Sequence, residues 1–377
     1  MTLTQPANQQ LPTLAQHASA GVTNYQSPIT NYQSRFLSAC HRIPVDTTPV
    51  WFMRQAGRYM AEYRAIREKY SLIEICHHPE IAAEVTLQPV KALGVDAAIL
   101  FADILLPAIP LGVGLEFAKG EGPVLQNPVR TMEDVKNLRP VDPDSDLGYV
   151  MDAIRLLRGL LGGVPLIGFC GAPFTVASYI IEGGSSREFL KTKSMMYSAP
   201  DVWHALMEKL SVVLSEYLVA QIRAGAQAVQ VFDSWVGALS PADYEEFVLP
   251  YSQKILQDAK KENVPVIHFG TNTTTLLPLM KRAGGDVIGL DWRIPLDDGW
   301  KLLGDDVAVQ GNLDPTILFA PRAEIKKRVH DILRRANGKP GHIFNLGHGI
   351  LQHTPVDNVK AVVDMVHEFS PLPVGEG

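Results

Sequence analysis

Two arginines and one aspartate carry charge at places where the local sequence gives no reason for it. Arg54 and Arg58 lie in "WFMRQAGRYM", at the end of an apolar run and across a glycine. Asp103, in "AAILFADILLPAIPLGVGL", is the only charged residue between positions 97 and 115. A carboxylate in such surroundings is costly unless a fixed donor or a ligand pairs with it. Since apolar residues follow it, Asp103 is poorly placed as a helix N-cap, and we expect it to contact a ligand rather than to form a structural salt bridge.

The arginine pair fits an anion. After Gly57 the spacing of "RYMAEYRAIREKY" predicts a helix, which places Arg58 in the first turn, where a cation opposes the helix dipole. A bound anion removes this conflict, and guanidinium groups bind carboxylates or phosphates in bidentate geometry. The alternative, that both arginines pair with neighbouring acids, stays open.

These residues lie within a repeating pattern of apolar runs and helical segments. Continuous hydrophobicity is typical of strands buried on both faces, as in a parallel sheet covered by helices. Helical spacing follows in 199–226, 241–262 and 356–369. We therefore predict a single-domain (β/α)₈ TIM-type barrel over 35–370, with a cleft at the C-terminal ends of the strands and an inserted hairpin at 111–130. The eight predicted strands are 49–55, 96–103, 164–171, 228–234, 264–270, 287–292, 307–313 and 342–349.

Nearly every predicted strand ends in a polar residue. Any one of them is ordinary, because polar residues often end strands, but in a barrel all of them reach the same rim. Tyr179, on a helix before a glycine pair, fits either a core tyrosine or a rim hydroxyl. The strand-end residues are Arg54, Asp103, Cys170, Asp233, Ser234, His268, Asp291, Asn312 and His348.

Composition excludes several other classes of protein. The formal net charge of -6 gives no general attraction to nucleic acid or to an anionic membrane. The three cysteines form no CxxC pair, so a disulfide framework and a zinc finger are not indicated, and a reducing compartment fits. No membrane span or secretory signal is predicted. Residues 1–34 contain no Lys, Arg, Asp or Glu and predict a disordered polar extension, and 371–377 predict a flexible tail.

Seven motifs together resemble the uroporphyrinogen decarboxylase family, in order, over about residues 36–369. They are "MRQAGRY", "FADIL", "IGFCGAPFTVASYIIEGGSS", "VFDSWVGALSP", "VIGLDW", "VQGNLDP" and "NLGHGI". The resemblance implies a barrel enzyme of haem and tetrapyrrole biosynthesis that removes CO₂ from the four acetates of uroporphyrinogen III, giving coproporphyrinogen III. It also implies a cytoplasmic homodimer that uses no cofactor and no metal and binds neither nucleic acid nor membrane.

The resemblance also assigns the site. Its catalytic residues would be Asp103, Arg54, Tyr179 and His348. Its substrate-binding residues would be Arg54, Gln55, Arg58, Asp103, Tyr179, Ser234 and His348. Decarboxylation of a pyrrole acetate requires prior protonation of the ring, and an ionised Asp103 would stabilise the resulting cation. The proton donor stays open, because guanidinium is a poor acid.

Two other functions are compatible with such a barrel. A corrinoid-linked methyltransferase would need zinc held by a His-x-Cys pair near the fifth strand, where this chain has His268 and Gly270. A non-catalytic tetrapyrrole-binding barrel would be expected to lose its strand-end polar residues, which are all present. A metal-dependent hydrolase is disfavoured because the first strand carries no His-x-His.

Overall fold

The computed structural model describes residues 34–118 and 122–369, which fall within one compact unit. The predicted extension (1–34, apart from Ser34) and tail (371–377) lie outside the described residues, so the predicted domain boundaries remain predictions. Ser34 caps the first helix, since its hydroxyl accepts the Leu37 N–H at 3.5 Å. The seven strands of the main sheet are parallel and follow one another in chain order: β1 (Ala98–Ile99), β4 (Leu166–Gly171), β5 (Ala228–Asp233), β6 (Val266–Gly270), β7 (Val287–Gly289), β8 (Ala308–Gln310) and β9 (His342–Ile343).

The first predicted strand, 49–55, is not a strand, yet it closes the barrel. Of 49–55, Val50 alone forms a bridge, with Phe344 after β9. On its other side, the carbonyl of Val50 accepts the N–H of Asp96, just before β1, at 2.8 Å. Segment 49–51 therefore joins the two edges of the sheet. The ladder stops there because side chains occupy the next N–H groups: Phe52 donates to Gln55 Oε1 and Met53 to Asn345 Oδ1.

Side chains inside the sheet show how strongly it curls. β5 and β8 are separated by two strands, but Gln310 Nε2 on β8 donates to Gln230 Oε1 on β5 at 3.1 Å. Gln310 Oε1 also accepts the indole N–H of Trp51 at 3.0 Å. Such contacts across the interior require a curved sheet, so the TIM-type barrel is confirmed, with seven strands and one bridging segment.

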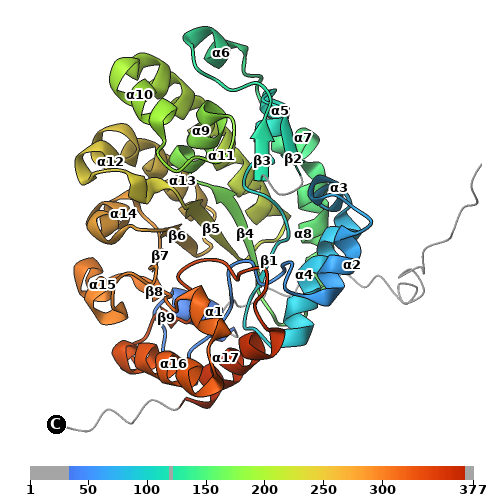
Figure 1. The fold of residues 1–377 in the computed structure, drawn as a ribbon, viewed down its shortest axis with the longest axis vertical. Coiled ribbons are helices and arrows are strands. Elements are labelled where there is room, and N and C mark those ends of the chain that lie inside the picture. Colours follow the sequence, from blue (N-terminus) through green and yellow to red (C-terminus); the bar gives the residue numbers. More distant parts are fainter. Residues whose placement is uncertain (1–33, 119–121, 370–377) are drawn as a thin grey trace, which may run out of the picture. The chain divides into compact units, whose positions relative to one another are not determined.

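Helices surround the strands (Figure 1). The predicted helix at 241–262 is two helices, because Pro250 has no N–H to donate and the chain breaks at Val248. The helices are α1 (Arg35–Cys40), α2 (Ala61–Arg67), α3 (Leu72–His77), α4 (Pro79–Leu93), α5 (Ala108–Leu111), α6 (Met132–Asn137), α7 (Pro143–Asp146), α8 (Gly148–Leu160), α9 (Pro173–Glu182), α10 (Leu190–Ser198), α11 (Pro200–Ala224), α12 (Pro241–Phe247), α13 (Leu249–Lys260), α14 (Leu277–Ala283), α15 (Leu296–Leu303), α16 (Arg322–Ala336) and α17 (Val356–Glu368).

The predicted insertion between the first two strands of the sheet is an antiparallel hairpin. It consists of β2 (Leu115–Ala118) and β3 (Gly122–Leu125), paired from Leu115 with Leu125 to Ala118 with Gly122. Leu125 N–H also donates to the carbonyl of Gly183, after α9, which fastens the hairpin to the body of the barrel.

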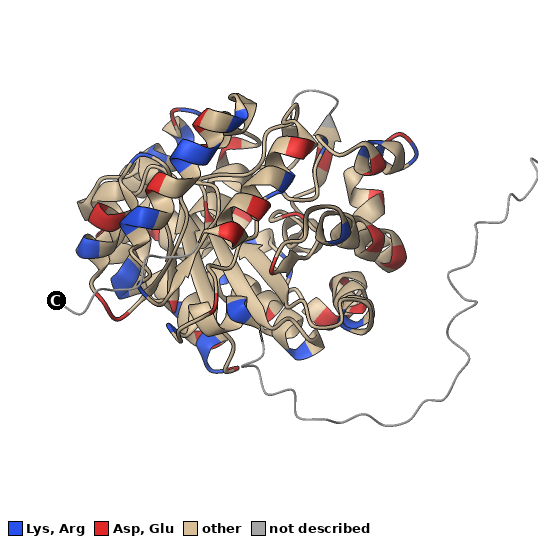
Figure 2. Cartoon of the chain, turned by 90° about the horizontal axis from the view of Figure 1, so that it is seen from below, with Lys and Arg blue, Asp and Glu red and all other residues tan. Residues whose placement is uncertain are grey.

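Charged residues are spread over the outer helices. In Figure 2 blue and red segments alternate around the molecule, while the strands at its centre are mostly tan. Among the described residues, no helix is long and apolar enough to cross a membrane.

Candidate functional site

Arg54 lies at the opening of the barrel at the C-terminal ends of the strands, called the barrel mouth below, and it has an unusual backbone conformation. It follows segment 49–51, and its φ of 59° lies in the left-handed region, which costs a residue with a Cβ about 1 to 2 kcal/mol. Strain of this kind is kept where the surrounding structure enforces it, often at a functional site. Here Gln55 enforces it, because its buried amide donates to Ala97 O at 3.1 Å and accepts from Phe52 N–H at 3.1 Å.

Neither arginine of the pair is neutralised by an acid. Within the described residues, the side chains of Arg54 and Arg58 take part in no ion pair, and both residues are exposed. The alternative of pairing with neighbouring acids is therefore not supported. Arg58 precedes α2, which begins at Ala61, so its predicted place in the first helical turn is wrong. The chain makes a turn at 58–59 before the helix, and Met60 is the N-cap.

Asp103 lies in the loop that follows β1. Its Oδ1 accepts the N–H of Leu105 at 2.8 Å, so Asp103 caps the turn at 104–107. The sequence analysis judged it poorly placed as the N-cap of a helix, and the element that it caps is indeed a turn. Burial raises the pKa of Asp103 above its ordinary value, opposed by the Leu105 N–H and the positive charge of Arg54. Arg54 and Asp103 thus act on one another across the mouth.

Tyr179, on α9, belongs to the same group of charges. Its ring stacks on Trp235 with 3.7 Å between the ring centroids. Burial and the negative charge of Asp103 raise the pKa of Tyr179 to about 12, and Arg54 opposes the shift. Of the two alternatives left open by the sequence, the half-buried rim position is the one observed, and the phenol keeps its proton at neutral pH.

His348 lies between two glycines that bring it to the same place. Burial, together with the positive charges of Arg54 and Arg293, lowers the pKa of His348 to about 4. The imidazole is therefore neutral at neutral pH. The structure thus brings Arg54, Asp103, Tyr179 and His348 into one electrostatic neighbourhood.

The other predicted site residues are placed differently. Gln55 is fully buried and its amide is occupied by backbone groups, so it positions its neighbours. Ser234 follows β5 and is half-buried, and its carbonyl accepts the hydroxyl of Thr271. Arg58 acts on Tyr63 through its charge. Contact of these three residues with a substrate remains a prediction.

Three of the strand-end polar residues do not reach the mouth. Cys170, Asp233 and His268 are fully buried. Successive residues of a strand face opposite sides, and Phe169 and Phe269, the neighbours of Cys170 and His268 in sequence, meet Phe232 with ring-centroid distances of 5.5 and 6.1 Å. The phenylalanines occupy one face of the sheet, so the polar residues lie on the other face, beneath the helices.

Asp233 is held by a helix residue on that outer face. Its Oδ1 accepts the hydroxyl of Thr175 at 2.9 Å, and Thr175 Oγ1 accepts the N–H of Trp235 at 3.2 Å. Burial raises the pKa of Asp233 to about 7. Asp233 therefore supports the stacked Trp235 and Tyr179 from behind.

Sequence reasoning did not single out Trp235 or Arg293. Trp235 directly follows "FDS", and Arg293 directly follows "LDW". A bulky aromatic residue or a cation just after the end of a strand is the signal that would have found them. Two strand-end residues that the sequence analysis did name, Asp291 and Asn312, stabilise loop structure. Asn312 Nδ2 donates to the backbone carbonyls of Asp291 and Ile294 at 2.9 and 2.7 Å.

No group of three or more His, Cys, Asp or Glu side chains in the described part of the chain is arranged to hold a metal ion. His268, the histidine of the alternative zinc site, is buried on the outer face, where burial lowers its pKa to about 4. Gly270 stands against Asp233 O and Thr273, with no space for a side chain.

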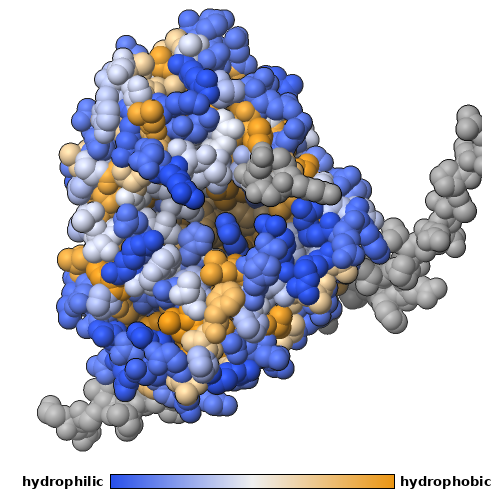
Figure 3. Space-filling view, viewed as in Figure 1, coloured by the Kyte–Doolittle hydropathy of each residue, from blue (hydrophilic) through white to orange (hydrophobic). Residues whose placement is uncertain are grey.

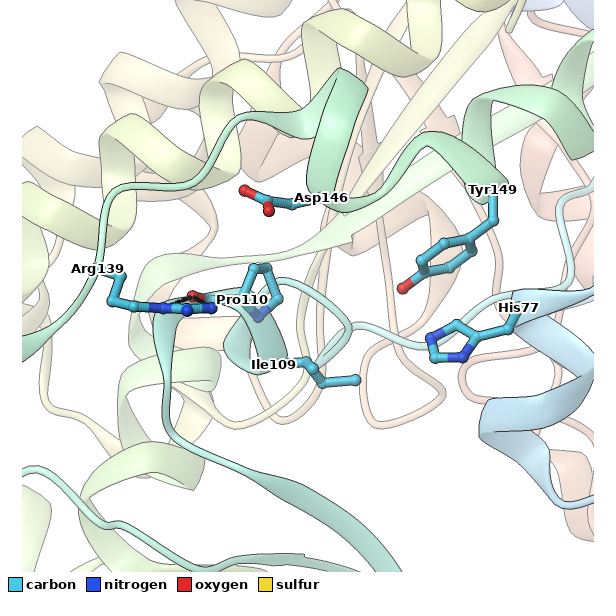
Figure 4. Close-up of a pocket in the computed structure, with 6 residues that line it drawn as sticks. All are labelled: His77, Ile109, Pro110, Arg139, Asp146 and Tyr149. Carbon is cyan, nitrogen blue, oxygen red and sulfur yellow. Dashed lines mark hydrogen bonds between the residues drawn. The ribbon is translucent and has the colours of Figure 1, made fainter.

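The hollow and the small pockets of the surface lie in different places. Figure 3 shows the face of Figure 1 hollowed near its centre, over β4 and β5, with apolar residues at the bottom. A separate pocket of about 330 Å³ lies on the outside, lined by His77, Ile109, Pro110, Arg139, Asp146 and Tyr149 (Figure 4). There, Arg139 Nε and Nη2 both donate to the Pro110 carbonyl, at 3.0 and 2.9 Å.

Comparison with known proteins decides between the functions that the barrel allows. The model of the family described as "Uroporphyrinogen decarboxylase (URO-D)" matches residues 31–369. The chain belongs to the uroporphyrinogen decarboxylase family. A uroporphyrinogen decarboxylase from Carboxydothermus hydrogenoformans is 59% identical over 338 residues, covering 89% of this chain and 97% of that protein. One from Sorangium cellulosum is 61% identical over 336 residues, covering 89% and 96%.

Solved structures support the fold of the decarboxylase family. A methyltransferase from Methanosarcina mazei has a TM-score of 0.75 at 22% identity, covering 89% of this chain and 97% of that one. A putative vitamin-B12 independent methionine synthase from Listeria monocytogenes has a TM-score of 0.53 at 12% identity, covering 85% and 96%. At these identities the likeness shows the barrel alone.

Proposed function

We propose that this chain is a uroporphyrinogen decarboxylase, a carboxy-lyase that removes CO₂ from the four acetate side chains of uroporphyrinogen to give coproporphyrinogen. The observation that carries the proposal is the identity of 56 to 61% to curated uroporphyrinogen decarboxylases over nearly the whole length of both chains. The convergence of Arg54, Asp103, Tyr179 and His348 at the barrel mouth supports it.

The reaction sets a clear electrostatic demand. Each acetate CH₂–COO⁻ takes up one proton and becomes CH₃ with release of CO₂. Direct loss of CO₂ would leave a carbanion, so the pyrrole carbon is protonated first, giving an iminium cation. The C–C bond then breaks and its electron pair neutralises the ring. A second proton goes to the exocyclic carbon, and loss of the first restores the pyrrole. The site must therefore stabilise a transient cation.

Asp103 is the group that meets this demand. Its carboxylate accepts the pyrrole N–H groups of the substrate and, when ionised, opposes the positive charge of the iminium. Burial favours the neutral acid in the free protein, and Arg54 and the Leu105 N–H favour the carboxylate. Binding of a substrate that supplies N–H donors and develops positive charge favours the carboxylate further.

The remaining residues hold the carboxylates of the substrate. Arg54 and Arg58 have no acid partner among the described residues, so their guanidinium groups are available to the eight carboxylates of uroporphyrinogen. Tyr179 keeps its proton and His348 is neutral at neutral pH, so both serve as neutral hydrogen-bonding groups, with Ser234 beside the stacked Trp235. Gln55 acts by holding the Arg54 turn.

The assembly and location of the protein complete the proposal. As the family resemblance implies, the chain works as a homodimer in the cytoplasm, without a cofactor. Light scattering coupled to size-exclusion chromatography measures the mass in solution, and a mass near twice the 41.4 kDa of the chain is expected.

The decisive experiment is analysis of products. The purified protein is incubated without oxygen with uroporphyrinogen, the products are oxidised to porphyrins, and these are separated by carboxylate number. Stepwise appearance of seven-, six-, five- and four-carboxylate porphyrins, with and without a metal chelator, is expected. Activity that requires zinc, cobalamin or a thiol acceptor would contradict the proposal.

A further inference from the structure

Two glycines let the chain close on His348 from both sides. A Cβ on Gly349 would fall well inside contact distance of Arg54 Cδ and Cγ. A Cβ on Gly347 would likewise collide with the backbone of Trp292. The loop 347–349 is therefore clamped between the Arg54 side chain on one side and the chain just before Arg293 on the other.

Arg293 is fixed in place at this second side. Its guanidinium pairs with Asp291, whose side chain is 1% exposed, and lies over the ring of Trp292 at 4.1 Å from the centroid. Its own side chain is 44% exposed, so part of the guanidinium faces solvent at the rim. A cation that is anchored on one edge and open on the other is prepared to bind an anion.

We infer that Arg293 is a substrate-binding residue that, with Arg54, holds carboxylates on either side of His348. This inference rests on the proposed function and extends it: one carboxylate arm of the tetrapyrrole contacts Arg54, and another contacts Arg293. The neutral imidazole of His348 lies between the two cations and can donate a hydrogen bond to either arm.

The positions of the charges support this reading. The charges of both Arg54 and Arg293 act on the His348 ring, which places the three groups in one cluster. A neutral histidine between two cations adds no third like charge to this cluster. Asp103 faces Arg54, and Asp291 pairs with Arg293 and also accepts the backbone N–H groups of Asn272 and Arg293. The solvent-exposed edges of the two guanidinium groups stay open to the carboxylates of the substrate.

The test is a comparison of steady-state constants for uroporphyrinogen in three variants. Arg293→Gln removes the charge, Arg293→Lys keeps it, and Arg155→Gln is the matched control. Arg155 is an exposed arginine paired with Asp152 at 2.7 Å on the outer helix α8. Loss of one charge-assisted contact to substrate should raise KM about tenfold or more. We expect this rise for Arg293→Gln, a smaller rise for Arg293→Lys, kcat within about twofold, and no change for Arg155→Gln.

A second readout separates binding from support of Asp291. If Arg293 serves only as the partner of Asp291, Arg293→Gln lowers Tm and kcat together and leaves KM within twofold of the unaltered protein. That result, or an unchanged KM in a folded variant, overturns the inference. If the unaltered protein itself yields no porphyrin of lower carboxylate number, the proposed function fails instead, so the two failures are distinguishable.

Discussion

At the scale of single residues, the site depends on charges kept in costly positions. Asp103 is held where burial raises its pKa, and Arg54 adopts a left-handed backbone conformation without being glycine. Each of these features lowers stability, and each places a charge at the barrel mouth. Such costs are expected where function, rather than folding, determines the residue.

Asp103→Asn should abolish most turnover while the fold is retained. Asparagine keeps the shape and one acceptor for the Leu105 N–H but removes the charge that opposes the iminium. Loss of this charge should cost about 3 kcal/mol or more, a rate factor of about a hundred upward. Asp103→Glu keeps the charge and should lose less.

The same variant should be more stable than the unaltered protein in denaturant at neutral pH. Because folding raises the pKa of this carboxyl, it destabilises the folded state progressively as the pH rises above the pKa of the unfolded chain, and fully above the folded-state pKa. Near-normal turnover by a folded Asp103→Asn protein would refute the assigned role.

Substitution of Arg54 can separate its charge from its backbone strain. Arg54→Ala and Arg54→Gly both remove the guanidinium, so both should weaken substrate binding by about 1.5 to 3 kcal/mol, measured as KM. Glycine accepts a φ of 59° without cost, so Arg54→Gly should be about 1 kcal/mol more stable to denaturant than Arg54→Ala. Equal stability of the two variants would show that position 54 is not strained.

At the scale of elements, loops rather than strands carry the chemistry, and glycines determine how closely the loops approach. Gly349→Ala should displace the Arg54 side chain and reduce kcat/KM about tenfold or more, because a Cβ there meets Arg54 Cβ, Cγ and Cδ together. The matched control is Gly163→Ala, since a Cβ at Gly163 meets no atom within 4 Å. Equal kinetics for the two variants would contradict the clamped loop.

The buried end of β5 predicts a pH dependence of stability. Folding raises the pKa of Asp233 from 3.8 to about 7, so the folded protein binds this proton more tightly than the unfolded chain. The resulting loss of stability develops as the pH rises from about 4 to about 7 and is complete above that. Asp233→Asn removes it.

The gain in unfolding free energy of Asp233→Asn over the unaltered protein should therefore grow by about 2 to 4 kcal/mol between pH 4.5 and pH 8. Comparing the two proteins at each pH cancels the contribution of His268 and His342, whose pKa values are lowered by burial. A gain that is independent of pH would mean that Asp233 is ionised without cost.

At the scale of the whole molecule, the sequence predicted the barrel because its seven strands are buried on both faces and read as continuous apolar runs. It overestimated the run at 49–55, since hydrophobicity cannot reveal that the side chains of Gln55 and Asn345 occupy the next N–H groups. It extended the strand at 96–103 to Asp103, whereas β1 ends at Ile99 and Asp103 lies in the loop that follows it. It could not tell which face Asp233 and His268 occupy, because a shift of one residue in register reverses the face.

The residues that surround His348 show the same limit. Gly347 and Gly349 are visible in the sequence, but the clamp they permit depends on Arg54 and Trp292, which are far away in the chain. Contacts of this kind depend on barrel closure by segment 49–51, which joins β9 to β1. The sequence therefore proposed Arg54, Asp103, Tyr179 and His348 as site residues, whereas their mutual arrangement required the structure.

The most direct test of the account is a crystal structure of the protein grown without oxygen in coproporphyrinogen, the product with the same four pyrrole N–H groups. We predict pyrrole nitrogens within about 3 Å of the Asp103 carboxylate, the usual length of such a hydrogen bond. Carboxylate arms should lie on Arg54 and Arg293. A tetrapyrrole bound elsewhere, with Asp103 contacting only Leu105 as in the free protein, would contradict the central claim that the barrel mouth is the active site.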